Sequence, residues 1–198
     1  GAQVVLTPAA EKMPGAVKKA IELQSQIANS FIPQQFENPA NPSIHRVTTA
    51  PEILQQTEGR LDVFVATAGT GGTITGTGEA LKEHLPNLQV IVVEPKGSPV
   101  LSGGEPGPHK LVGTSPGFVP AILNTDVYDE IVQVADEHAI QTTRDLARLE
   151  GILVGPSAGA AVWTAIQKAR VLGPGKRVLC IAPDNGERYL SMEGLFGE

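Results

Sequence analysis

The sequence has only one cysteine, Cys180, in 198 residues, which excludes an internal disulfide framework and a structural zinc site built on cysteines. It also lacks any apolar run of about 18 residues, so no membrane-spanning helix is expected. Positive charge is scarce, with 15 basic residues against 21 acidic ones, and the longest basic runs are pairs such as Lys176-Arg177. This balance argues against a nucleic-acid-binding surface.

The N-terminus has neither an initiator methionine nor the charged start of a secretory leader. We therefore expect a cytoplasmic protein and, because the methionine is missing, a fragment.

The histidines at 45, 84, 109 and 138 share no metal-ligand spacing, so surface or loop residues are expected there rather than a metal site. The chain is rich in glycine and proline, with 22 and 16 residues, and its apolar fraction of 41% is enough for a folded core with many turns.

Apolar stretches alternate along the chain with segments of helical periodicity. We expect strands at 3–6, 61–67, 88–94, 126–134, 152–154 and 177–182, and helices at 15–29, 43–57, 72–84, 136–150 and 157–172. Near-continuous apolar strands between helices predict an α/β fold with a parallel sheet flanked by helices on both faces. The proline- and glycine-rich segments 31–42 and 95–120 are predicted to be ordered loops, the second of them near a functional site.

A glycine-rich turn links the expected strand 61–67 to the expected helix 72–84. In this turn Gly69, Thr70, Gly71, Gly72 and Thr73 bring backbone N–H groups together at a helix N-terminus, and the threonines add hydroxyl donors. One tight turn would need fewer glycines, so the pattern predicts a phosphate-binding site.

The class of phosphate ligand is narrowed by what this turn lacks. It has no Gly-Lys-Ser/Thr sequence, which excludes a Walker loop. A dinucleotide fingerprint begins at Gly69 and Gly71, but Ile74 stands where the third glycine belongs. Glu94, at the end of the next strand, is placed where such a site would hold its ribose-binding acid. A nicotinamide-binding domain therefore stays an alternative.

A second small-residue turn, residues 155–159, reads Gly-Pro-Ser-Ala-Gly and matches the nucleophile elbow of serine hydrolases. That fold needs an acid and then a histidine after the serine. Asp184 is the only aspartate after Ser157, and the last histidine, His138, comes before it. Since this order excludes the triad, Ser157 is instead expected to cap a helix and to direct its hydroxyl at a ligand.

Six segments resemble, in family order, the cysteine synthase (O-acetylserine sulfhydrylase) family of fold-type-II pyridoxal-phosphate enzymes. They cover nearly the whole chain: QQFENPANPSIH (34–45), GTGGTITG (69–76), VEPKGSPV (93–100), GPHKLVG (107–113), EGILVGPSAGA (150–160) and APDNGERYL (182–190). The resemblance implies a tryptophan-synthase-β-like fold, pyridoxal 5'-phosphate as cofactor and a transferase of cysteine biosynthesis. Such an enzyme converts O-acetylserine and sulfide to cysteine and acetate by β-replacement.

The resemblance also implies roles for single positions. Residues 69–73 match the cofactor phosphate loop, and Ser157 matches the serine that hydrogen-bonds the pyridine nitrogen. Gln35 matches a contact to the substrate carboxylate, and Gly113 a backbone position near the substrate amine. His109 and its neighbour Lys110 match a mobile entrance loop. A homodimer is implied, as is docking of the C-terminal tail of serine acetyltransferase in some members.

The sequence departs from the family at its start. The family's Schiff-base lysine lies in an early Ser-x-Lys segment followed by a Ser/Thr-Gly-Asn-Thr-Gly loop, and this sequence has neither. The resemblance therefore implies that residues 1–41 end a small N-terminal domain, that 42–198 form the large cofactor-binding domain, and that the chain alone is inactive. Residues 113–117 also differ from the usual family pattern. Cystathionine β-synthase, a serine/threonine dehydratase and a non-catalytic phosphate-ligand or partner-binding module stay alternatives.

Overall fold

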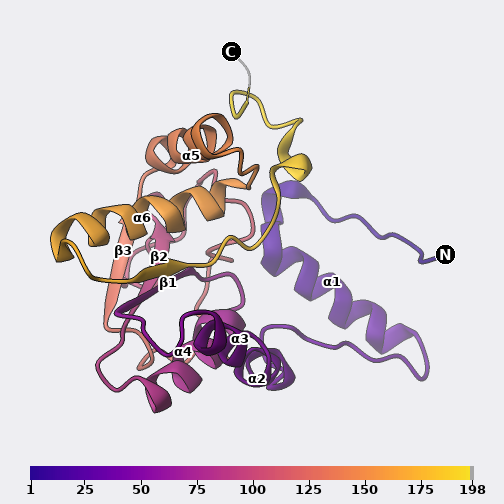
Figure 1. Ribbon diagram of the computed structural model, residues 1–198. Helices are drawn as coiled ribbons and strands as arrows, with labels where there is room; N and C mark the ends of the chain where they lie inside the picture. The colour runs from indigo at the N-terminus through magenta and orange to yellow at the C-terminus, as the bar shows by residue number, and fades with distance from the viewer. Residues whose placement is uncertain (197–198) are drawn as a thin grey trace.

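A four-stranded parallel sheet forms the centre of the computed structural model, which describes residues 1–196 (Figure 1). Its strands are β1 (Val63–Thr67), β2 (Gln89–Pro95), β3 (Glu130–Val134) and β4 (Val178–Cys180), in the spatial order β3-β2-β1-β4. β1 pairs in parallel with both β2 and β4. The predicted parallel sheet is thus confirmed, and the strand leading into the glycine-rich turn is one of its two central strands.

Helices cover both faces of this sheet, as predicted (Figure 1). α3 (Thr49–Gln56) and α4 (Gly72–His84) lie on one face, with α2 (Ala40–Val47) packed against α4. α5 (Asp136–Asp145), which continues into a π-helical turn at Leu146–Glu150, and α6 (Pro156–Leu172) lie on the other. The sheet is therefore the middle of three layers.

The alternation of side chains along the strands explains the two cores. Phe64 of β1 points to the α4 side, where it belongs to one cluster with Ile74 and Leu81, all fully buried. Val65, the next residue, belongs to the opposite cluster with Ala161 of α6. Because successive residues of a strand face opposite sides, an uninterrupted apolar strand is what a sheet covered on both faces requires.

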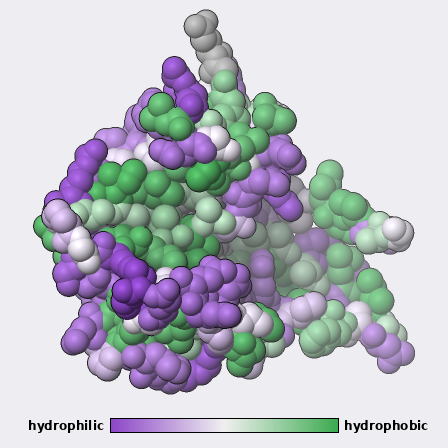
Figure 2. Space-filling view, in the orientation of Figure 1, coloured by the Kyte–Doolittle hydropathy of each residue, from purple (hydrophilic) through white to green (hydrophobic). Residues whose placement is uncertain are grey.

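α1 (Lys12–Gln26) stands apart from this three-layer body (Figure 1). Gly15 is its only buried residue, and Ile21 is 54% exposed. Apolar residues are also exposed in the segment before it, where Leu6 is 88% exposed, and Figure 2 shows hydrophobic patches on this projecting part of the molecule. Lys12 Nζ donates to Gly107 O at 3.2 Å and so connects the start of α1 with the 95–120 loop.

Two strand predictions are wrong. Residues 3–6 are exposed and pair with no strand in the described part of the chain. A short, mostly apolar segment forms a strand only where a neighbouring strand accepts its backbone hydrogen bonds. Residues 152–154 contribute only an isolated antiparallel bridge between Val154 and Asn185. The predicted helix 43–57 is divided at Thr48 into α2 and α3. Pro51 accounts for the division, because it has no N–H to bond the carbonyl of Val47.

No helix within residues 1–196 has the length and apolar character needed to cross a membrane. The same described residues contain no group of three or more histidine, cysteine, aspartate or glutamate side chains arranged to hold a metal ion.

Candidate phosphate-binding site

The glycine-rich turn lies where β1 ends and α4 begins. Gly71 has φ = 86°, in the left-handed region that favours glycine, and a Cβ there would lie 2.8 Å from Cβ of Leu123. The first N–H group to bond back into α4 is that of Thr75, which donates to Gly71 O at 3.0 Å. The N–H groups before it stay at the positive end of the helix, as an anion site requires.

The small-residue turn at the start of α6 lies at the same edge of the sheet. Gly155 N donates to the backbone oxygen of Asp184 at 3.4 Å, and Asp184 follows the carboxyl end of β4. Since β4 is the parallel neighbour of β1, both turns lie at the carboxyl ends of adjacent strands. This is the edge at which open parallel sheets bind their ligands.

Ser157 is buried, with 3% exposure, but it is not the N-cap of α6 as predicted. The helix begins one residue earlier, at Pro156, and Gly155 is the N-cap without a side-chain cap bond. Gly159 has to be glycine, because a Cβ there would clash with Thr143 Oγ1 and Ala139 O of α5. The sequence 155–160 thus serves close packing of α5 on α6 and also places a serine hydroxyl at the carboxyl edge.

A cavity of about 590 Å³ opens beside the glycine-rich turn. Its lining brings together four of the predicted site residues, Gln35, Gly69, Thr70 and Gly113. Gly71, Gly72, Thr73 and Ser157 are not among its described lining residues. Gly69 must be glycine, because a Cβ there would clash with the backbone oxygen of Gly113. The structure thus joins the expected substrate side and one end of the phosphate loop in one cavity.

The predicted loop between β2 and β3 forms one wall of this cavity. Ser115 anchors it: its N–H donates to Ala68 O at 3.0 Å, and its hydroxyl donates to Ser98 O at 2.9 Å. Ser115 has φ = 44°, an uncommon conformation for a residue other than glycine. His109 also lines the cavity, and burial lowers the pKa of its imidazole, against the opposing effect of the Asp136 carboxylate.

Glu94 does not serve as the ribose-binding acid that a dinucleotide site would need. Its carboxylate is 2% exposed and accepts hydrogen bonds from Leu101 N at 2.8 Å and from the Ser102 hydroxyl. Both acceptor oxygens are therefore used to hold the start of the 95–120 loop. This arrangement speaks against the nicotinamide alternative.

Two residues of α2 that the sequence analysis did not place in the site contact the phosphate loop. Asn41 Nδ2 donates to Thr70 Oγ1 at 3.0 Å and to Gln35 O at 2.8 Å. His45 Nε2 lies 3.2 Å from Thr73 Oγ1, and its Nδ1 lies 2.9 Å from Thr49 Oγ1. Burial lowers the pKa of His45, which favours the neutral ring. His45 is thus a half-buried helix residue rather than the surface or loop residue expected.

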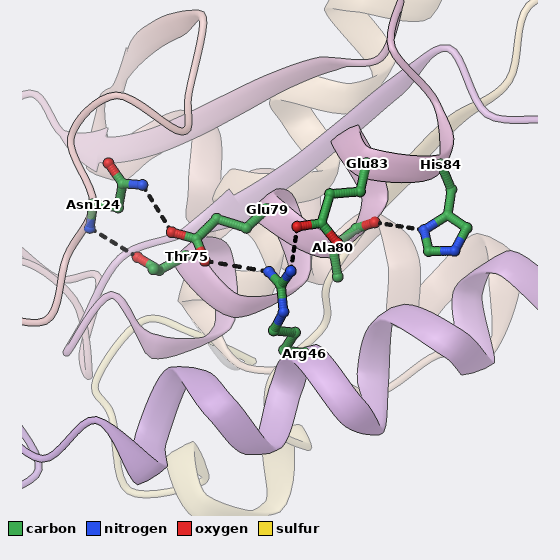
Figure 3. A network of polar contacts seen from close by, with 7 residues as sticks. All are labelled: Arg46, Thr75, Glu79, Ala80, Glu83, His84 and Asn124. Carbon is green, nitrogen blue, oxygen red and sulfur yellow. Dashed lines mark hydrogen bonds and ion pairs between the residues drawn. The ribbon is translucent and has the colours of Figure 1, made fainter.

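A polar network holds α2 on α4 (Figure 3). Arg46 of α2 pairs with Glu79 at 3.5 Å and with Glu83, both on α4, and the hydrogen bond to Glu83 raises the pKa of the guanidinium. Glu79 also accepts from Asn124 Nδ2 at 2.8 Å, and Asn124 N donates to Thr75 Oγ1 at 3.0 Å. These contacts tie two segments, α2 and the loop at Asn124, to the helix whose N-terminus forms the site.

The donors at this edge suit a phosphate group. They are backbone N–H groups at a helix start and threonine hydroxyls, shaped by a left-handed glycine that leaves no room for a side chain.

Comparison with known proteins gives the family. A family model described as pyridoxal-phosphate dependent enzyme matches residues 1–184. The chain is 65% identical over 196 residues to a probable cysteine synthase of Bacillus subtilis (strain 168), covering 98% of this chain and 63% of that protein. It is 56% identical to a cysteine synthase of Staphylococcus aureus (strain Mu50 / ATCC 700699), covering 96% of this chain and 62% of the relative.

Solved structures agree in fold. An O-acetylserine dependent cystathionine beta-synthase from Helicobacter pylori superimposes with a TM-score of 0.94 at 45% identity, covering 100% of this chain and 64% of that one. A cysteine synthase from Entamoeba histolytica gives a TM-score of 0.90 at 36% identity, covering 96% and 57%. The chain therefore spans less than two thirds of the length of these relatives.

Proposed function

The chain belongs to the pyridoxal-phosphate-dependent enzyme family, and from this premise we propose that it forms the cofactor-phosphate-binding part of a cysteine synthase. The observation that carries the proposal is the glycine-rich turn at the N-terminus of α4, which opens beside a cavity that Gln35 and Gly113 also line. Residues Gly69, Thr70, Gly71, Gly72 and Thr73 are proposed to hold the cofactor phosphate through N–H and hydroxyl donors.

When bound, pyridoxal phosphate supplies an electron sink that makes the α-proton of an amino-acid substrate acidic and lets a β-substituent leave. The chain's own residues bind and orient. Gln35 is proposed to contact the substrate carboxylate, and the backbone at Gly113 to lie near the substrate amine. Ser157 is proposed to meet the pyridine nitrogen from the start of α6, at the same edge of the sheet.

The proposed reaction of the full-length parent is a β-replacement. The bond from the β-carbon of O-acetylserine to its ester oxygen breaks, and acetate leaves with the electron pair. A bond from sulfur to the same carbon forms, and the product is cysteine. The names of the relatives from Bacillus subtilis and Staphylococcus aureus support this choice of acceptor.

A cystathionine β-synthase is the second candidate. The Helicobacter pylori structure of that name covers the whole of this chain, and both reactions begin from O-acetylserine. The segment that departs from the usual family pattern lines the cavity with Thr114, Ser115 and Pro116. We propose that this wall is where a site for homocysteine would differ from a site for sulfide.

A substrate panel on the full-length parent separates these functions. With O-acetylserine as the donor, we expect faster product formation with sulfide than with homocysteine, measured as kcat/KM for each acceptor. Activity with homocysteine but none with sulfide would contradict the cysteine synthase proposal and support the second candidate. Activity with serine or threonine and no acceptor would identify a dehydratase.

The domain division and the partners stay proposals. The division after residue 41 falls inside α2, which begins at Ala40, so the backbone crosses this boundary as a helix. A homodimer, docking of a serine acetyltransferase tail and a cytoplasmic location rest on the family resemblance.

A further inference from the structure

We infer that Asn41 is a positioning residue that couples the substrate-carboxylate segment at Gln35 to the phosphate loop at Thr70, an inference that rests on the proposed function. Asn41 lies near the start of α2, and its side-chain amide reaches both segments. Nδ2 donates to Gln35 O at 2.8 Å and to Thr70 Oγ1 at 3.0 Å. Both N–H groups of the amide are therefore used, one on each proposed subsite.

The carbonyl side of the Asn41 amide packs closely against the phosphate loop at Gly72. A Cβ added at Gly72 would lie 2.5 Å from Cγ of Asn41 and would clash with Oδ1. The carboxamide therefore occupies the space that a side chain at Gly72 would need. Gly72 is a glycine for this reason as well as for its place at the start of α4.

The bond from Asn41 decides what the Thr70 hydroxyl can do. Its oxygen accepts from Asn41 Nδ2 at 3.0 Å and also from Gly72 N at 3.3 Å. A hydroxyl has two acceptor lone pairs and one donor hydrogen, so both lone pairs are used and the hydrogen is directed to a further acceptor. Thr70 lines the cavity, and a phosphate oxygen there would receive that hydrogen. The hydrogen bond from Asn41 thus leaves the Thr70 hydroxyl to act as a donor toward a ligand in the cavity.

The bond to Gln35 acts on the other subsite. Gln34, the residue before, has φ = 46°, so the backbone turns sharply at this point. Asn41 holds the carbonyl of Gln35 just after this turn and thereby sets the direction of the peptide that precedes buried Phe36. A shift of the phosphate loop that moves Thr70 is passed through one rigid amide to Gln35.

α2 does not depend on Asn41 for its place. It is also held by the Arg46 pairs with Glu79 and Glu83, and by the close approach of Pro42 to Gly76. Removing the Asn41 amide donors should therefore leave the helix in position while it alters the two subsites.

The test compares Asn41→Asp with Asn38→Asp in the 198-residue chain. Asn41→Asp keeps the shape but replaces both N–H donors by an oxygen, so the Thr70 hydroxyl turns to the new carboxylate. Asn38→Asp adds the same charge three residues away and loses its own bond to Pro33 O, but Asn38 has no bond to the phosphate loop. Binding of pyridoxal 5'-phosphate and of inorganic phosphate is measured by titration, with amide chemical shifts followed by ¹⁵N NMR.

We expect Asn41→Asp to weaken binding of both phosphates by about tenfold or more, the effect of one lost charge-assisted hydrogen bond. In wild-type and in Asn38→Asp, the ligand should shift amide signals of residues 69–73 and of 35–37 together. In Asn41→Asp the shifts at 35–37 should be lost while those at 69–73 persist, a change that a purely structural role would not produce.

The outcomes keep the two proposals apart. If wild-type binds neither phosphate at residues 69–73, the proposed function fails. If wild-type binds and Asn41→Asp matches Asn38→Asp in affinity and in shift pattern, only the role of Asn41 is overturned. If Asn41→Asp does not fold, Asn41→Ala decides by the same comparison, and coupled shifts at wild-type affinity in that variant would overturn the inference.

Discussion

The 198-residue chain is expected to form no cysteine above background from O-acetylserine and sulfide, even with pyridoxal phosphate present. Removal of the α-proton needs a positioned base, and the family resemblance assigns that role to a lysine in a Ser-x-Lys segment that this sequence does not contain. Lys12 is the one lysine among the described lining residues of the cavity, and its Nζ donates to Gly107 O. Cysteine formation is measured against the full-length parent as the positive control.

Cofactor-dependent cysteine formation by the isolated chain would contradict this prediction. The variant Lys12→Met would then show whether the cavity's own lysine had supplied the base. An unchanged rate in Lys12→Met would direct attention to other groups, among them His109, whose lowered pKa keeps its imidazole neutral over a wider pH range.

Gly76→Ala is expected to lower the free energy of unfolding by about 2 kcal/mol or more. A Cβ at Gly76 would clash with the backbone oxygen of Pro42 and would lie 2.8 Å from its carbonyl carbon and 3.1 Å from Arg46 N. These are backbone atoms of α2, which cannot rotate away, so the whole helix would have to move off α4. This cost opposes the gain of about 1 kcal/mol that alanine brings to a helix interior.

Urea unfolding followed by circular dichroism measures this effect. Gly59→Ala serves as a comparison in which the added methyl group meets no neighbour, because Gly59 has φ = 66° and nothing lies within 4 Å of a Cβ there. Gly59→Ala should lower the free energy of unfolding only by the strain of an alanine in the left-handed region, about 1–2 kcal/mol. If Gly76→Ala proved as stable as wild-type or more stable, helix propensity would outweigh packing, and the close approach of α2 and α4 would not be a stabilising feature.

The sheet and the helix after the glycine-rich turn could be predicted because local pattern and tertiary environment agree there. The predicted helix 72–84 has the same bounds as α4, and the glycine-rich turn marks where it starts. Residues 3–6 have the same apolar character as a strand, but strand formation depends on a neighbour that a local pattern does not reveal. Pro51 did carry a local signal for the break between α2 and α3.

The phosphate loop could be predicted because its function depends on consecutive residues. Asn41 and His45 could not be predicted from spacing, because they meet Thr70 and Thr73 across the packing of two helices. Their separation by four residues on α2 places them on one helix face, but only the position of α4 turns that face toward the site. Glu94 is the opposite case: its position in the sequence suits a ribose-binding acid, but in the structure its carboxylate accepts hydrogen bonds from the loop that follows it.

The central claim is that residues 69–73 recognise a phosphate group at the N-terminus of α4. It is tested most directly by ¹⁵N NMR titration of the 198-residue chain with pyridoxal 5'-phosphate and, in parallel, with pyridoxal, which lacks the phosphate. Pyridoxal 5'-phosphate should produce its largest amide shifts at Gly71, Gly72 and Thr73, and pyridoxal should leave these signals unchanged at the same concentration. Equal responses to both compounds, or shifts that spare residues 69–73, would contradict the account.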